Sequence, residues 1–507
     1  MEEPTLDVDD IQGHVLVGFG GGAQILIGIR VHPVALEQAR LVLLGLAPRI
    51  TTSRTATEAR TLRRKMGLAV GPTINPDDVG LTISFSYQGL KLLGPFEGPT
   101  DIHFRSGAAA DALDLKDDVD QAGNPVGWSV GGTNDTTPHV FLVLGSMNSR
   151  AIKEYWAELA ALLQPIADVV FYHEASRLPE EREHFGFVDG ISQPGPRGTV
   201  DGVPLIERTL PTDHRDYEFY ARPGQPLVWP GQFVFGYPAQ EPESAEAGPI
   251  AGGNDIRLRN GSILVFRKLR QDVSAFHAAM TQLAADFTAA GVPADGPLVA
   301  AWCVGRWPDG TPVSLSPMGE NNAISSSTVR RNGFLFRSVC PAVELNIGGR
   351  TEQFPETAPD RFGYSCPFFS HIRKVNPRDM PVDQGGAGVT LRSQMLRRGV
   401  PYGPEWSEET DGTDRGLMFL SYQTSIENQF YRLMTLWVNN AFAPPPTAQG
   451  IDPLIGAPQD GRTLVRRPPD SRNYKAVLPG RWVSTVGAGY FFTPGIAAYR
   501  SIVKGKE

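Results

Sequence analysis

The first 175 residues alternate short apolar runs with segments in which apolar residues recur at helical spacing. The apolar runs have the length of strands and are rich in branched side chains. The four predicted strands are residues 24–31, 79–87, 139–144 and 166–173. The segments 32–46 and 149–163 have apolar residues at every third or fourth position, which indicates amphipathic helices, and Asn148 or Ser149 could cap the second. The order strand, helix, strand, strand, helix, strand predicts a ferredoxin-like unit.

The second half of the chain contains elements of the same kinds, separated by longer loops. Residues 195–260 are rich in proline, glycine and charge, which is typical of irregular connections. The predicted strands are 231–237, 261–269 and 417–422, and the predicted helices are 272–287 and 426–438. We therefore expect an α+β fold of two ferredoxin-like domains, one over 1–205 and one over 206–507.

Composition supports a folded chain with more than one core. At 507 residues the chain is too long for one usual hydrophobic core. Hydrophobic residues make up 41% and charged residues 20%, as in globular proteins. The net charge is −8, and no block of like charges occurs, so a nucleic-acid partner is not expected. Cys303, Cys340 and Cys366 are too few and too far apart for a disulfide framework or a CxxC metal site.

The N-terminal segment bears on location. Residues 1–10 are acidic and lack an apolar core, unlike a secretory signal. No run of about 18 apolar residues occurs, so a membrane span is not expected. We expect a cytoplasmic location, with secretion left open, and no membrane partner.

Three segments carry candidate chemistry. In GFVDG (186–190) a single carboxylate, Asp189, lies between glycines that allow a close backbone approach. His371 lies next to the cations of SHIRKVNPR (370–378), and a third segment, LRRGVPYGPE (396–405), contains an arginine pair. Each has an ordinary structural interpretation: a local turn, a solvated basic segment and an exposed turn. The nine histidines form no HxH or HExxH pair, so a zinc site is not indicated.

These three segments together resemble signature segments of the dye-decolourising peroxidase family. Further similar segments lie at 9–13, 231–238, 261–272 and 415–423, so the resemblance runs from about residue 9 to residue 456. The length and long loops resemble the larger branch, which includes fungal and bacterial members. The family fold has two ferredoxin-like domains, with haem between the sheet and helices of the second.

The resemblance implies a role for several residues. His371 matches the axial ligand of the haem iron, and Asp189 matches the acid on the opposite, distal face. Arg397 matches the distal arginine, although Arg398 and Arg392 are close enough to leave the choice open. The other implied cofactor contacts are Arg373 for the haem propionates, Leu417 and Phe419 over the distal face, and Asp452 bonded to the ligand histidine.

The implied activity is that of a peroxidase with one haem b per chain. Hydrogen peroxide would be cleaved to form a ferryl intermediate, which then oxidises dyes, phenolics or Mn2+. A carboxylic acid in place of histidine as the proton-transfer group predicts best activity at acidic pH, because ordinary aspartate pKa values are about 3.9 and histidine values about 6.5. The physiological reductant and the oligomeric state stay open. The alternatives are a haem-binding or haem-handling protein with little turnover, and a haem-free interaction protein.

Bulky dyes would need a route around a buried haem. Trp437 and Tyr402 are candidate surface sites for electron transfer, because both lie close in sequence to distal segments. A core position for Trp437 is about as well supported, since it follows Leu433 and Met434 at helical spacing.

Overall fold

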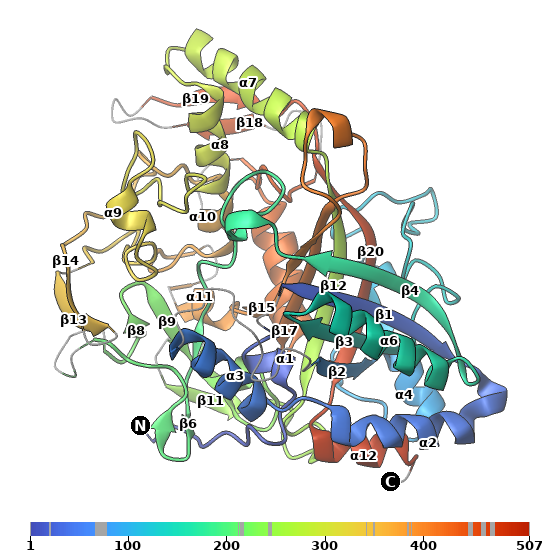
Figure 1. Ribbon diagram of the computed structural model, residues 1–507. Coiled ribbons are helices and arrows are strands. Elements are labelled where there is room, and N and C mark those ends of the chain that lie inside the picture. Colours follow the sequence, from blue (N-terminus) through green and yellow to red (C-terminus); the bar gives the residue numbers. More distant parts are fainter. Residues whose placement is uncertain are drawn as a thin grey trace.

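The structure is a computed structural model. It describes residues 2–19, 22–65, 79–210, 212, 217–241, 246–340, 342–347, 350–382, 385–386, 388–444, 450–457, 463–466 and 472–505. Both described ends of the chain lie at the same side of the molecule in Figure 1. None of the described helices is long and apolar enough to cross a membrane.

A nine-stranded antiparallel sheet forms the centre of the molecule (Figure 1). Its order is β15-β17-β12-β20-β2-β3-β1-β4, and β16 pairs with β17 beside β15. The strands are β1 (Ala23–Val31), β2 (Gly80–Phe85), β3 (Val140–Ser146), β4 (Ala167–Ser176), β12 (Ser262–Gln271), β15 (Leu396–Arg397), β16 (Val400–Tyr402), β17 (Gly416–Gln423) and β20 (Val483–Thr493).

The sheet consists of two ferredoxin-like units with the same internal order. In the first unit β4 pairs with β1, β1 with β3, and β3 with β2. In the second unit β20 pairs with β12, β12 with β17, and β17 with β15 and β16. The units join where β2 meets β20, at Phe85 and Phe492. The predicted α+β fold is therefore confirmed, while the domain division at 205/206 stays a prediction.

Three of the predicted helices are present as regular α-helices. These are α2 (Leu36–Leu46) and α6 (Ser149–Leu163) in the first unit, and α7 (Val273–Ala289) in the second. Asn148, not Ser149, caps α6, since its side chain accepts hydrogen bonds from two backbone N–H groups. The predicted helix 426–438 forms two consecutive π-helical segments, η7 (Ile426–Tyr431) and η8 (Leu433–Val438).

The sheet curls until its two ends meet, so that one face becomes the inside of a barrel. At the closure, the rings of His173 on β4 and Tyr402 on β16 are 4.8 Å apart. The inside is filled by a buried apolar cluster that includes stacked Phe141 and Phe491, whose ring centroids are 4.6 Å apart. Residues of the alternate strand positions face outward and are covered by the helices, because successive side chains of a strand point to opposite faces.

The predicted strand 231–237 is wrong. Pro230–Gln232 is a 3-10 turn, and the chain then folds back on itself. A Cβ at Gly231 would lie 2.3 Å from the carbonyl oxygen of Tyr237, and Gly236 has a φ of +87°. The apolar residues of this run are buried by a compact turn, which periodicity alone does not distinguish from a short buried strand.

The remaining elements surround the sheet and fill the long connections. The other helices are α1 (Gly13–Leu16), α3 (Ser53–Lys65), α4 (Tyr87–Leu93), α5 (Ile102–Ser106), α8 (Gly296–Val304), α9 (Asn322–Ser325), α10 (His371–Val375), α11 (Gly388–Arg392) and α12 (Ile496–Val503). The short strands are β5 (Gly195–Pro196), β6 (Thr199–Val200), β7 (Val203–Pro204), β8 (Tyr220–Arg222), β9 (Gln225–Val228), β10 (Pro238–Gln240), β11 (Ala247–Ile250), β13 (Val343–Ile347), β14 (Arg350–Phe354), β18 (Thr463–Arg466) and β19 (Tyr474–Val477).

Candidate active site

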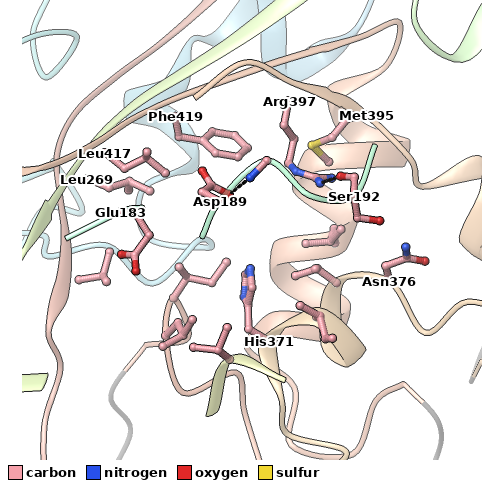
Figure 2. Close-up of a pocket in the computed structure, with 18 of the residues that line it drawn as sticks. Glu183, Asp189, Ser192, Leu269, His371, Asn376, Met395, Arg397, Leu417 and Phe419 are labelled. Carbon is pink, nitrogen blue, oxygen red and sulfur yellow. Dashed lines mark hydrogen bonds between the residues drawn. The ribbon is translucent and has the colours of Figure 1, made fainter. Parts of the chain in front are cut away.

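A cavity of about 300 Å³ lies between the sheet of the second unit and the short helix α10. Strands β12 and β17, the segment after β4, α10 and the π-helical segments all contribute to its walls. Figure 2 shows His371 on one side of the cavity and Asp189, Arg397, Leu417 and Phe419 on the other. The volume is at the lower end of the range typical of ligand and cofactor pockets.

His371 is held from behind by Asp452. Its Nδ1 lies 2.7 Å from Oδ2 of Asp452, whose side chain is completely buried. The other oxygen, Oδ1, accepts backbone N–H bonds from Leu454 (2.8 Å) and Ile455 (3.1 Å). The imidazole is therefore fixed in orientation, and its ring points into the cavity (Figure 2). Burial by itself lowers the pKa of His371, but attraction and hydrogen bonding to the carboxylate outweigh it and raise the pKa above its ordinary value.

Asp189 lies opposite, on a loop that needs its two glycines. Gly186 and Gly190 have φ values of +95° and +71°, which other residues rarely adopt. A Cβ at Gly190 would meet no atom within 4 Å, so the space beside the loop is open. The Asp189 carboxylate accepts one short bond, 2.6 Å, from the N–H of Gly190 and is otherwise exposed at the cavity.

Of the three neighbouring arginines, Arg397 is the one in the cavity lining. Arg397 lines the cavity, and its guanidinium donates to the carbonyl of Ser192. Burial lowers the pKa of Arg397, and the nearby Asp189 carboxylate opposes this effect. Arg398 points to the other side of the same strand, where it donates to the carbonyl oxygens of α1. Arg392 does not line the cavity in the described part of the chain.

Leu417 and Phe419 reach the cavity because they alternate along β17. The intervening Met418 and the following Leu420 face the barrel interior instead. Phe419 also contacts Phe430, with ring centroids 6.1 Å apart, so the two rings form part of one apolar wall.

The expectation that Arg373 faces the cofactor is wrong. Its side chain is fully buried and pairs with Asp360, at 3.1 Å. The guanidinium lies between the rings of Phe336 and Phe368, at 4.3 and 4.2 Å from their centroids. Helix α10 turns this face away from the cavity, so Arg373 supports the fold behind His371.

The expected surface position of Trp437 and Tyr402 is also wrong. Trp437 is 0% exposed and Tyr402 is 1% exposed. Trp437 packs in the core under η8. The hydroxyl of Tyr402 donates to Asp414, while its ring lies in the barrel closure beside Lys268. Neither indole nor phenol ring can touch a bulky molecule in solution.

Four arginines besides Arg397 line the cavity, namely Arg267, Arg306, Arg378 and Arg481. Arg378 donates to the carbonyls of Gly224, Asn332 and Phe334, and Arg306 donates to those of Gly310 and Arg331. Neither forms an ion pair with any described carboxylate. Burial, together with neighbouring cations for Arg306, lowers the pKa of Arg306 to about 9, and burial lowers that of Arg378 to about 10. Arg378 lies in the quoted 370–378 segment, whereas no sequence pattern marks Arg306.

Glu183 is another lining residue that the sequence did not mark. Its carboxyl accepts hydrogen bonds from two backbone N–H groups of its own loop and from Gln271. Burial raises the pKa of Glu183 to about 7, with the Asp189 carboxylate adding to this effect.

Comparisons with known proteins agree on one group of enzymes. Residues 10–177 match the model of the DyP dimeric alpha+beta barrel domain. The chain is 29% identical to a dye-decolorizing peroxidase of Mycena epipterygia, over 99% of this chain and 88% of that protein. It is also 29% identical to the multifunctional dye peroxidase DyP2 of an Amycolatopsis species, over 92% of this chain and 89% of that protein.

Solved structures give the same result. An ancestral D-type dye-decolorizing peroxidase superimposes with a TM-score of 0.77 at 27% identity, covering 98% of this chain and 99% of that chain. A dye-decolorizing peroxidase in complex with 2,6-dimethoxyphenol superimposes with a TM-score of 0.75 at 27% identity and the same coverage.

Proposed function

The chain belongs to the dye-decolourising peroxidase family, and we propose that it works as a haem peroxidase in which His371 binds iron while Asp189 and Arg397 act on hydrogen peroxide. The observation that carries this proposal is the arrangement across one cavity. A histidine tethered by a buried carboxylate faces an acid and a guanidinium that have few protein partners.

The residues present fit a haem. His371 supplies an imidazole whose second nitrogen forms no hydrogen bond within the described chain. Apolar side chains of the cavity wall suit the faces of a porphyrin. They include Leu269, Leu417, Phe419, Leu433 and Met434. Haem propionates need charge-assisted partners.

Arg306 and Arg378 suit that need, because both are cations of the cavity lining that form no ion pair with a carboxylate in the described chain. We therefore assign them to the propionates in place of Arg373, with one haem b per chain.

When bound, haem supplies an iron that binds peroxide and exchanges electrons with donors. The chain supplies the proton transfer and the charge stabilisation. Asp189, as a carboxylate, takes the proton from the near oxygen of hydrogen peroxide and gives it to the far oxygen, so that water can leave. Arg397 stabilises the negative charge that develops as the O–O bond breaks. Asp452 keeps His371 oriented and increases the electron donation of the imidazole.

The donors are small aromatic molecules. A related enzyme has been solved with a phenol, 2,6-dimethoxyphenol, and relatives are named for dye oxidation. Because a related structure is a complex with a phenol, we propose phenolics ahead of Mn2+.

The test is reconstitution with haem followed by rapid mixing with peroxide. We expect a Soret band typical of histidine-ligated ferric haem, a fast spectral change on mixing, and oxidation of 2,6-dimethoxyphenol. A stable Soret band with no reaction would instead indicate a haem-handling protein, and no Soret band would exclude haem chemistry altogether.

A further inference from the structure

Glu183 stands at the start of the loop that carries Asp189, and its carboxyl ties that loop together. Oε2 accepts the N–H of Phe185 at 3.0 Å, and Oε1 accepts the N–H of Phe187 at 3.1 Å. The backbone N–H of Glu183 also donates to the carbonyl of Phe187, at 2.9 Å. The side chain therefore fixes the backbone two residues before Asp189.

The same carboxyl has a neutral partner across the cavity wall. Nε2 of Gln271, on β12, donates to Oε2 of Glu183 at 2.7 Å. Oε1 of Gln271 is buried and has no hydrogen-bond partner among the described residues. A half-turn of this amide would present Oε1 to Glu183, where it could accept the proton of a carboxylic acid. The pair can thus accommodate Glu183 in either protonation state.

The charges around Glu183 favour its neutral form. On its own loop the Asp189 carboxylate carries the same charge and adds to the rise in the pKa of Glu183. On β12, Arg267 is paired with the buried Asp117. No described cation forms an ion pair with Glu183.

The other charged groups of the cavity are engaged elsewhere, and two of them, Arg306 and Arg378, donate to backbone carbonyls. Arg481, before β20, is paired with Asp118. His371 is tied to Asp452 on the opposite wall, and Arg397 donates to the carbonyl of Ser192. Burial raises the pKa of Glu183 to about 7.

We propose that Glu183 is a positioning residue that holds the Asp189 loop and whose ionisation sets the alkaline limit of peroxide cleavage. When neutral, Glu183 leaves Asp189 as the single negative charge on the distal wall. When ionised, it places a second negative charge on that wall, near the position where negative charge develops on peroxide, and this opposes bond breaking. The inference rests on the proposed peroxidase function.

The first test observes the proton itself and does not depend on turnover. Infrared difference spectra of haem-free and haem-loaded protein are recorded across pH 4 to 9. We expect a carboxylic-acid carbonyl band that disappears near pH 7, is absent in Glu183→Gln and is unchanged in Glu180→Gln, an exposed control in the same segment. Absence of the band in the natural protein, or its persistence in Glu183→Gln, overturns the proposal.

The second test is the pH dependence of the reaction with peroxide. Glutamine keeps the size of Glu183 and one acceptor oxygen but cannot ionise. Relative to its own rate at acidic pH, Glu183→Gln should therefore keep reacting to higher pH, with its alkaline limb moved up by about one pH unit or more, the usual scale of a like-charge effect. An alkaline limb that does not move overturns the proposal. An equal loss of rate at every pH also overturns it, because such a loss would mean that Glu183 has a structural role only.

A further variant keeps the test valid if Glu183→Gln does not fold. Gln271→Met removes the hydrogen bond that lowers the pKa of Glu183, so the infrared titration and the alkaline limb should both move to higher pH. Unchanged values contradict the proposal. If the natural protein, loaded with haem, fails to react with peroxide, the proposed function falls, while the infrared titration still decides whether Glu183 holds its proton.

Discussion

The two walls of the cavity are built in opposite ways. On the α10 side, the functional atom of His371 is backed by a carboxylate with no exposed surface, and that carboxylate is itself tied by two backbone N–H groups. On the opposite side, the Asp189 carboxylate accepts one described hydrogen bond, from the N–H of its neighbour Gly190, and is otherwise exposed to the cavity. One wall is suited to hold a permanent group, and the other is left open to act on a transient small molecule.

The largest expected effect comes from removing the anchor of the first wall. His371→Ala should abolish stable haem binding, because no other histidine lines the cavity in the described chain. The measurement is the Soret absorbance after reconstitution. His277→Ala, which removes an exposed histidine on α7, is the matched control and should load normally. A normal histidine-ligated spectrum in His371→Ala would contradict the proposal that His371 binds the haem iron.

The second largest effect is expected from substitutions on the open wall, at Asp189 or Arg397. These substitutions should leave haem binding intact. At least one of Asp189→Asn and Arg397→Leu should slow the reaction with peroxide by a factor of about 10² or more, the usual scale of one acid-base or electrostatic contribution. Stopped-flow mixing measures the rate. Arg392→Leu makes the same change in charge outside the cavity and should react normally. Near-normal rates in both Asp189→Asn and Arg397→Leu would contradict the proposal that these two residues act on peroxide.

A smaller effect is expected from Asp452→Asn, which keeps the shape of the first wall but removes its charge. Partners that orient a metal ligand typically contribute 10- to 100-fold in affinity or activity. We expect faster haem loss, measured by transfer to a haem-scavenging protein, and a weakened iron–histidine stretch in the Raman spectrum. If both values stay at those of the natural protein, the carboxylate is not what holds His371.

The smallest effect concerns Trp437, which lies behind the cavity. Because its indole is fully buried and its N–H has no described partner, Trp437→Phe loses volume but no described hydrogen bond. We expect about 1–2 kcal/mol of lost stability, measured by denaturant unfolding, from the cavity left behind. Turnover of large dyes should not change relative to small phenols, and a selective loss for dyes would mean that Trp437 conducts electrons from within the core.

The pattern along the chain was sufficient for the fold of the first unit. Its four strands and two helices have clear apolar periodicity, and the order of elements permits few topologies. The failure at 231–237 has a local cause, because a short apolar run is buried equally well by a strand or by a compact turn, and Gly231 allows the chain to fold back closely.

The sequence by itself identified segments that reach the cavity, because Asp189 and His371 each lie in a motif whose residues are adjacent along the chain. Only the tertiary structure decided which side chains face the cavity. Arg397 and Arg398 differ by one strand position and so point to opposite faces. Arg373 is turned into the core by the short helix that presents His371.

The contacts of Glu183 with Gln271 and of His371 with Asp452 join residues that are 88 and 81 positions apart. Periodicity describes each residue relative to its neighbours along the chain. Charge pairing, burial and the pKa values that follow from them depend instead on which distant segments fold against each other.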